Sequence, residues 1–168
     1  HPSEAQRNFG YCPQFDALFD LLTGREHLEF YGRVKGIPES ELKSVVDRKL
    51  HELTLEPHAE RLSKGYSGGN KRKLSVAMAT MGEPAVVFLD EPSTGVDPVA
   101  RRFLLDVISN ISKRSSVVLT THSMEECEAV CSRIGIMVDG AFRCMGSAQH
   151  LKTKYGAGFQ LEANLSIH

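Results

Sequence analysis

Apolar side chains recur every three or four residues in four stretches of the chain, a spacing typical of helices with one buried face. The first stretch begins at Thr23-Gly24-Arg25-Glu26, which has the form of a capping box and predicts a helix from about 26 to 35. Gly36 ends this helix, and Pro38 begins the next one. The apolar positions are Leu28, Tyr31 and Val34; Leu42, Val45, Val46, Leu50 and Leu53; Leu74, Ala77, Met78 and Met81; and Phe103, Leu104, Val107, Ile108 and Ile111.

The third helix is predicted from about 69 to 81, because Gly82 and Pro84 follow it as helix-ending residues. Asp97, as N-cap, and Pro98, in the first turn, begin the fourth helix. A further short helix is expected to open at the capping box Ser123-Met124-Glu125-Glu126.

Short β-branched runs between these helices predict strands. Residues 85–89 and 116–120 are expected to be buried parallel strands, and 9–12 a third strand that ends before Pro13-Gln14. Asp139-Gly140, between apolar runs at 134–138 and 141–145, predicts a hairpin with a type I′ turn. The alternation of strands and helices indicates an α/β fold with a parallel sheet and right-handed crossovers, and residues 23–62 form a mostly helical insert.

Composition narrows the possible partners. The 168 residues suffice for about one domain, and 20 basic against 21 acidic residues give no cationic surface for nucleic acid. Lys71-Arg72-Lys73 is the only compact basic run, and we interpret it as a solvated helix face. The four cysteines form no Cys-x-x-Cys pair, so they indicate reduced thiols. The longest wholly apolar run, 85–89, is too short to span a membrane.

Two motifs carry the candidate chemistry. Ser67-Gly68-Gly69 at a helix start offers backbone N–H groups, a hydroxyl and a positive helix end to an anion. Asp90-Glu91 follows an apolar strand and supplies one carboxylate for a metal ion and one for a water molecule. Either motif alone also fits a loop before a helix or a helix cap.

The two motifs occur in order, with Gln14 upstream and His122 downstream. The segment Tyr66-Ser67-Gly68-Gly69-Asn70-Lys71-Arg72-Lys73-Leu74-Ser75 resembles the signature motif of ATP-binding cassette (ABC) ATPases, in the form used by the A subfamily of lipid transporters. The resemblance covers essentially the whole chain. It implies a P-loop NTPase-like parallel sheet core with a helical insert, and an ATPase that uses ATP and Mg²⁺.

The resemblance also implies a role for each candidate residue. Asp90 takes the Walker B position and binds Mg²⁺, and Glu91 is the general base that orients the attacking water. Gln14 resembles the Q-loop glutamine, which reaches Mg²⁺ and water, and His122 resembles the switch histidine that contacts the γ-phosphate. Alone, Gln14 also fits a surface residue, and His122 and Glu91 fit residues at a strand end and a helix start.

The family works as pairs of cassettes. By resemblance, Ser67, Gly68 and Gly69 contact ATP held by the opposite cassette, and Asp97 belongs to a D-loop, 93–97, that crosses the dimer interface. Asp97 also fits a plain N-cap. The implied partners are a second nucleotide-binding domain, the transmembrane domains of the parent protein and its lipid cargo, at the cytosolic face of a membrane.

One departure from the family pattern is plain: the sequence has no G-x-x-x-x-G-K-S/T. The phosphate loop is absent, as is the aromatic platform for adenine, and we interpret this as truncation of the amino-terminal part. Residues 10–18 and 121–128 resemble the second cassette of A-subfamily transporters more than the first. The chain alone is then expected to be inactive. The expected parts are 1–22, the Q-loop region; 23–62, the helical subdomain; 63–145, the core; and 146–168, a carboxy-terminal extension whose residues 155–161 resemble the strand that follows the cassette.

Two alternatives remain. A soluble cassette ATPase of the chromosome-maintenance or translation type carries coiled coils or basic surfaces, whereas this insert is short and the charge is balanced. A non-catalytic module would lack the phosphate loop altogether, but it would have no use for the base Glu91 or for His122.

Overall fold

The chain divides into two compact units, one ending at Ser123 and one beginning at Met124. The structure is a computed structural model that describes residues 8–155. Most of the tail expected to resemble a further strand, 155–161, therefore lies outside the described residues.

The first unit is built on a three-stranded parallel sheet with the order β1 (Phe9–Cys12), β2 (Val86–Asp90) and β3 (Ser116–Thr120). In register, Cys12 pairs with Leu89, and Leu89 with Leu119. The parallel sheet predicted from the alternation of strands and helices is confirmed. All three strands therefore end at the same edge of the sheet, although long stretches of sequence separate them.

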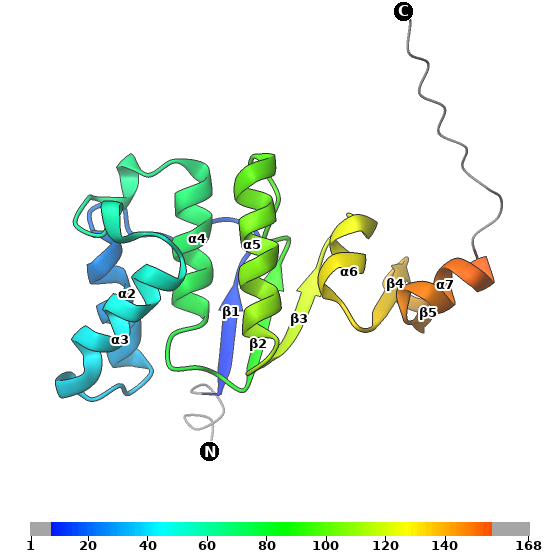
Figure 1. Ribbon diagram of the computed structural model, residues 1–168, viewed down its shortest axis with the longest axis horizontal. Helices are drawn as coiled ribbons and strands as arrows, with labels where there is room; N and C mark the ends of the chain where they lie inside the picture. Colours follow the sequence, from blue (N-terminus) through cyan, green and yellow to red (C-terminus); the bar gives the residue numbers. More distant parts are fainter. Residues whose placement is uncertain (1–7, 156–168) are drawn as a thin grey trace, which may run out of the picture. The chain divides into compact units, whose positions relative to one another are not determined.

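Two helices, α4 (Gly68–Ala79) and α5 (Pro98–Ile111), lie side by side across the sheet (Figure 1). Their apolar stripes form the core together with the inward side chains of the strands, among them Leu74, Ala77, Val87, Leu89, Leu104 and Ile108. The backbone of β1 approaches the end of α4 so closely that a Cβ at Gly10 would lie 1.9 Å from the carbonyl oxygen of Ala79. Only glycine allows this approach.

The expectation that the strands are buried on both faces is wrong for the part of the chain that the structure describes. Val87 and Leu89 are buried, but Phe88 between them is 40% exposed, and Val118 on β3 is 48% exposed. Exposure alternates from one residue to the next along these strands, because other elements pack against only one face of the sheet within residues 8–155.

The predicted insert consists of α2 (Gly24–Val34) and α3 (Glu39–Glu52), followed by the short 3₁₀ turns η1 (Glu56–His58) and η2 (Ser63–Gly65). The capping box is confirmed: Glu26 N–H donates to Thr23 Oγ1 at 3.2 Å, and Thr23 N–H donates to Glu26 Oε2 at 2.8 Å. An antiparallel bridge between Thr23 and Leu62 closes the insert at its base. The insert returns the chain directly to the start of α4.

The second unit contains α6 (Met124–Val130), β4 (Ile134–Val138), β5 (Ala141–Gly146) and α7 (Ala148–Tyr155). The predicted hairpin is confirmed, since β4 and β5 pair antiparallel around Asp139-Gly140, whose φ values are +52° and +75°. Two consecutive positive φ values are the mark of a type I′ turn. Among residues 8–155, no helix has the length and apolar character needed to cross a membrane.

Cys12, at the end of β1, gives a prediction for the pH dependence of stability. Burial raises the pKa of its thiol to about 11 from 9.0, with the nearby Arg72 acting in the opposite direction. The unfolded chain loses the thiol proton first, so between about pH 9 and about pH 11 the free energy of unfolding falls by roughly 2 kcal/mol. Denaturant titration of the chain across this range measures the effect.

The matched control is Cys12→Ala, which removes the titrating group but leaves every lysine and tyrosine. Its stability should fall less steeply over the same range. Equal slopes for the two proteins would show that the thiol of Cys12 does not titrate differently in the folded and unfolded states.

Candidate functional site

Four of the predicted site residues lie at or just after the ends of the three strands. Gln14 lies just after β1, Asp90 and Glu91 at the end of β2, and His122 just after β3. Because the strands are parallel and adjacent, these residues share the carboxyl edge of the sheet, where open α/β sheets bind ligands. The structure thus brings together residues that are up to 108 positions apart in the sequence, from Gln14 to His122 (122 − 14).

The backbone turns sharply at Glu91. Its φ is +46°, in the left-handed region that residues other than glycine seldom adopt. Its N–H donates to the carbonyl oxygen of Thr120 at 3.1 Å, and the hydroxyl of Thr120 donates to Asp90 Oδ1. Such a conformation persists only where its surroundings hold it, and it is common at functional sites.

The carboxylate of Glu91 faces β3. Its Oε2 atom accepts a hydrogen bond from Thr94 Oγ1 at 2.9 Å and lies 2.9 Å from His122 Nδ1. The Glu91 side chain is 19% exposed, whereas that of His122 is 78% exposed. The structure therefore pairs the candidate base with the candidate switch histidine, with the histidine on the solvent side.

Gln14 reaches this edge by its backbone. Its side chain is exposed, and its carbonyl oxygen accepts a hydrogen bond from Arg72 Nη1 at 3.3 Å. The amide group of Gln14 is thus free to contact a ligand at the carboxyl edge.

The signature turn and the predicted D-loop end side by side. Ser67 is the N-cap of α4 and accepts a hydrogen bond from Asn70 N–H at 3.3 Å, and Asp97 caps α5 in the same way. A Cβ at Gly69 would lie 3.3 Å from Ala100 Cβ and 3.7 Å from Asp97 Oδ2, whereas a Cβ at Gly68 would meet nothing within 4 Å. Two helix N-termini therefore lie next to each other, with Gly68 on the open side.

The interpretation of Lys71-Arg72-Lys73 as a solvated face is wrong for Arg72, which is 3% exposed. Its guanidinium donates to backbone carbonyl oxygens, among them Pro13 at 2.6 Å and Asp90 at 2.8 Å. Because Arg72 lies between two lysines, the charge pattern of the sequence indicates an exposed helix face and gives no sign that Arg72 is buried. A signal is nevertheless present, because Arg72, Val76 and Ala79 follow helical spacing on a second buried stripe of α4.

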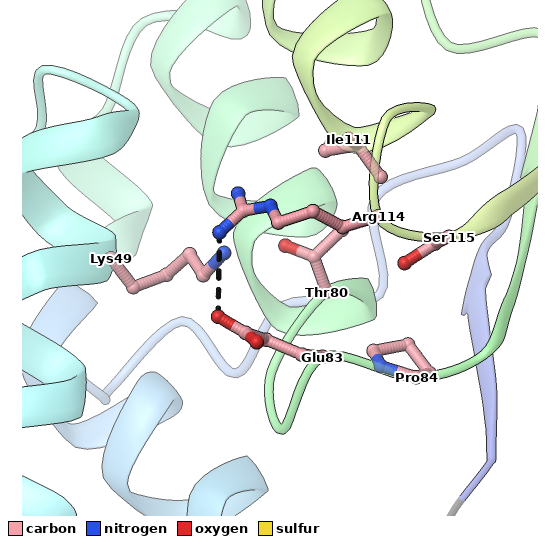
Figure 2. Close-up of a pocket in the computed structure, with 7 residues that line it drawn as sticks. All are labelled: Lys49, Thr80, Glu83, Pro84, Ile111, Arg114 and Ser115. Atoms are coloured by element: carbon pink, nitrogen blue, oxygen red, sulfur yellow. Dashed lines mark hydrogen bonds and ion pairs between the residues drawn. The ribbon is translucent and has the colours of Figure 1, made fainter.

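Two hollows in the described part of the chain are lined by residues other than those of the carboxyl edge. Figure 2 shows a small pocket that Arg114 and Glu83 border with an ion pair at 3.4 Å. Its volume, about 10 Å³, holds at most one water molecule. The pocket is lined by residues that precede β2 and β3, among them Pro84 and Ser115, so it lies at the amino edge of the sheet, away from Glu91.

The carboxyl edge offers the ligands that Mg²⁺ prefers. Asp90 and Glu91 supply carboxylate oxygens, and Gln14 supplies an amide oxygen. Within residues 8–155, no three His, Cys, Asp or Glu side chains gather as a metal site. This sparse set fits Mg²⁺, which keeps several waters and is commonly completed by phosphate oxygens of a substrate.

Comparison with known proteins finds close relatives. The chain is 56% identical to the mouse phospholipid-transporting ATPase ABCA3 over 96% of its own length and 10% of that protein. It is 57% identical to the human retinal-specific phospholipid-transporting ATPase ABCA4 over 94% of its length and 7% of that protein. The rat ATP-binding cassette sub-family A member 7 is 59% identical over 95% of the chain and 7% of that protein. The chain thus spans about a tenth or less of these relatives.

The fold gives the same answer. A solved structure described as the ATP binding subunit of an ABC transporter superposes with a TM-score of 0.79 at 28% identity, over 92% of this chain and 65% of that one. The family model described as ABC transporter matches residues 1–94. The chain therefore belongs to the ABC transporter family and resembles its sub-family A members along nearly its whole length.

Proposed function

We propose that this chain forms the catalytic half of an ATP-hydrolysing motor domain. The observation that carries the proposal is the pairing of Glu91 with His122, across adjacent strands, at the edge where Gln14 and Asp90 also lie. Glu91 is the candidate base, and neighbouring side chains orient its carboxylate at an edge that is open to ligands. A carboxylate held in this way can accept a proton from a water molecule and so activate it.

Each residue then has a definite task. Asp90 and the amide of Gln14 would hold Mg²⁺, which neutralises phosphate charge when bound. Glu91 accepts the proton of the attacking water, and Thr94 and His122 keep its carboxylate in place. The exposed His122 ring is also free to donate toward a phosphate oxygen.

A second cassette completes the site. The N-termini of α4 and α5 lie side by side and present backbone N–H groups around Ser67 and Gly68. We assign this surface to ATP held by the partner cassette, with Asp97 shaping the contact between the two. The anion-binding capacity of helix N-termini supports this assignment.

The wider function follows from the relatives. Two of those compared are named phospholipid-transporting ATPases, so we propose lipid transport by a membrane protein with two cassettes and transmembrane domains, with this chain at the cytosolic face. The phosphate loop would come from sequence outside these 168 residues. The missing loop is also the one observation that favours a non-catalytic cassette.

The isolated 168-residue chain should not bind Mg·ATP with micromolar affinity. The phosphate loop provides most backbone donors to the phosphates, and the sequence lacks it. Isothermal titration calorimetry measures this directly. Tight stoichiometric binding would mean that the described edge suffices to hold the nucleotide.

In a protein that contains the complete cassette, Glu91→Gln should lower turnover by roughly 10²–10⁴ while ATP still binds, because a positioned base is lost. The measurements are phosphate release and nucleotide binding. Glu83→Gln removes the same charge at the opposite edge and serves as the matched control. Hydrolysis by Glu91→Gln at the rate of this control would place the base elsewhere.

Gly68→Asp tests the contact with the partner's ATP. The side chain has open space, and an acid in the first turn favours the helix, so folding should be unaffected. Its charge should repel the partner's phosphates and lower hydrolysis at that composite site by at least about tenfold. Photolabelling of this cassette through its own phosphate loop should persist.

Gly68→Asn, which has the same shape without the charge, is the control. Gly69 is less suitable, because a side chain there would crowd Ala100 and Asp97. If Gly68→Asp instead removed labelling of its own cassette and left the partner's site closed and active, the assignment to the partner would be wrong.

A further inference from the structure

Arg72 is the most densely bonded side chain at the carboxyl edge. It lies in α4, and its three guanidinium nitrogens donate to five backbone carbonyl oxygens at 2.6 to 3.3 Å. Those carbonyls belong to Pro13, Gln14, Asp90, Glu91 and Pro92.

The contacts of Arg72 connect two loops that are far apart in the sequence. The Nη1 atom binds the loop that follows β1, and Nε and Nη2 bind the loop that follows β2. The Nη1 atom also donates to Asp16 Oδ1 in an ion pair at 3.4 Å, and the same oxygen accepts from Ser75 Oγ at 2.9 Å. Arg72 thus faces five peptide carbonyl oxygens at the ends of two strands and one carboxylate.

The Glu91 peptide needs this support. Its φ of +46° is costly for a glutamate, and its carbonyl oxygen accepts from Arg72 Nη2 at 2.9 Å. On the other side, its N–H is held by Thr120. Arg72 thus fixes the direction in which the Glu91 side chain leaves the backbone.

Arg72 also belongs to the helix that begins at the signature turn. It lies five positions after Ser67, which corresponds to roughly 7–8 Å along a rigid helix. A shift at the start of α4 must therefore move the guanidinium, and through it both loops.

We infer that Arg72 is a positioning residue that couples the signature turn, at Ser67, to Gln14 and Glu91 of the same cassette. This inference rests on the proposed function. The partner's nucleotide, by contacting the start of α4, sets the placement of the base and of the Q-loop on the other side of Arg72. Hydrolysis in this cassette then depends on closure with its partner.

Lysine cannot replace Arg72 in this role. The guanidinium is a planar fork with five N–H donors, whereas an ammonium has three donors around one point. An ammonium group at this position can form good hydrogen bonds to one of the two loops, but it cannot reach both loops with good geometry. Glutamine removes the charge and leaves buried carbonyls without donors.

The test compares Arg72→Lys and Arg72→Gln with Lys73→Gln in the complete transporter. Lys73 is the matched control, because it lies next to Arg72 but binds Thr54 Oγ1 at 2.8 Å and the ring of Phe103. We expect Arg72→Gln to lower kcat by about 10–100-fold with KM for ATP nearly unchanged, because a small misplacement of the base is costly. Arg72→Lys should be intermediate, and Lys73→Gln close to the unmodified protein.

A double-mutant comparison separates positioning from general destabilisation. If Arg72 acts through Glu91, then Arg72→Gln should cause almost no further loss of turnover in a Glu91→Gln background. Hydrogen–deuterium exchange gives a readout that needs no hydrolysis: peptides covering 13–18 and 90–95 should exchange faster together in Arg72→Gln and not in Lys73→Gln.

The outcomes separate the two proposals. If Glu91→Gln retains turnover, the proposed function fails, and the exchange data alone decide the role of Arg72. If Glu91→Gln is inactive but Arg72→Gln keeps its kcat, or if the two loops exchange as in Lys73→Gln, the coupling role of Arg72 is overturned.

Discussion

A charged side chain buried among peptide carbonyls organises the carboxyl edge of this sheet. Arg72 is 3% exposed, and among residues 8–155 the carboxylate that lies closest to it, that of Asp16, is 3.4 Å away. Such a charge is tolerated only if its donors are satisfied, so the loops after β1 and β2 must present their carbonyl oxygens to it. The positions of Gln14, Asp90 and Glu91 follow from that requirement. The parallel strands define the carboxyl edge of the sheet, and the guanidinium of Arg72 positions the two loops at that edge.

Features encoded by neighbouring residues could be predicted from the sequence. Thr23 with Glu26, Asp97 with Pro98, and Asp139 with Gly140 each form a signal within four residues, and each gives the expected cap or turn. The burial of Arg72 could not be predicted in this way, because its partners at Pro13 and Pro92 lie 59 and 20 residues away. The exposure of Phe88 depends equally on what packs against the sheet. Tertiary contacts decide both cases.

In the candidate site, too, some features could be predicted from the sequence and others depend on tertiary contacts. Parallel strands end at one edge, so the proximity of Glu91 and His122 follows from the strand pattern, although they are 31 residues apart. The left-handed backbone at Glu91 has no such signal, because glutamate favours other conformations. Nor does the sequence reveal that Gly68 is open while Gly69 is crowded by α5, since both belong to the same motif. Which glycine faces a ligand is a property of packing between helices.

At position 91, where φ is positive, the residue that would be best for stability differs from the residue that supplies a carboxylate. Glycine would adopt this conformation without strain, so selection for stability alone would replace the glutamate. A carboxylate there lowers the stability of the resting domain in exchange for a group aimed across the sheet toward His122. Stabilising substitutions found by screening this domain for thermal tolerance alone would therefore tend to collect at position 91 and remove the carboxylate that we propose as the base.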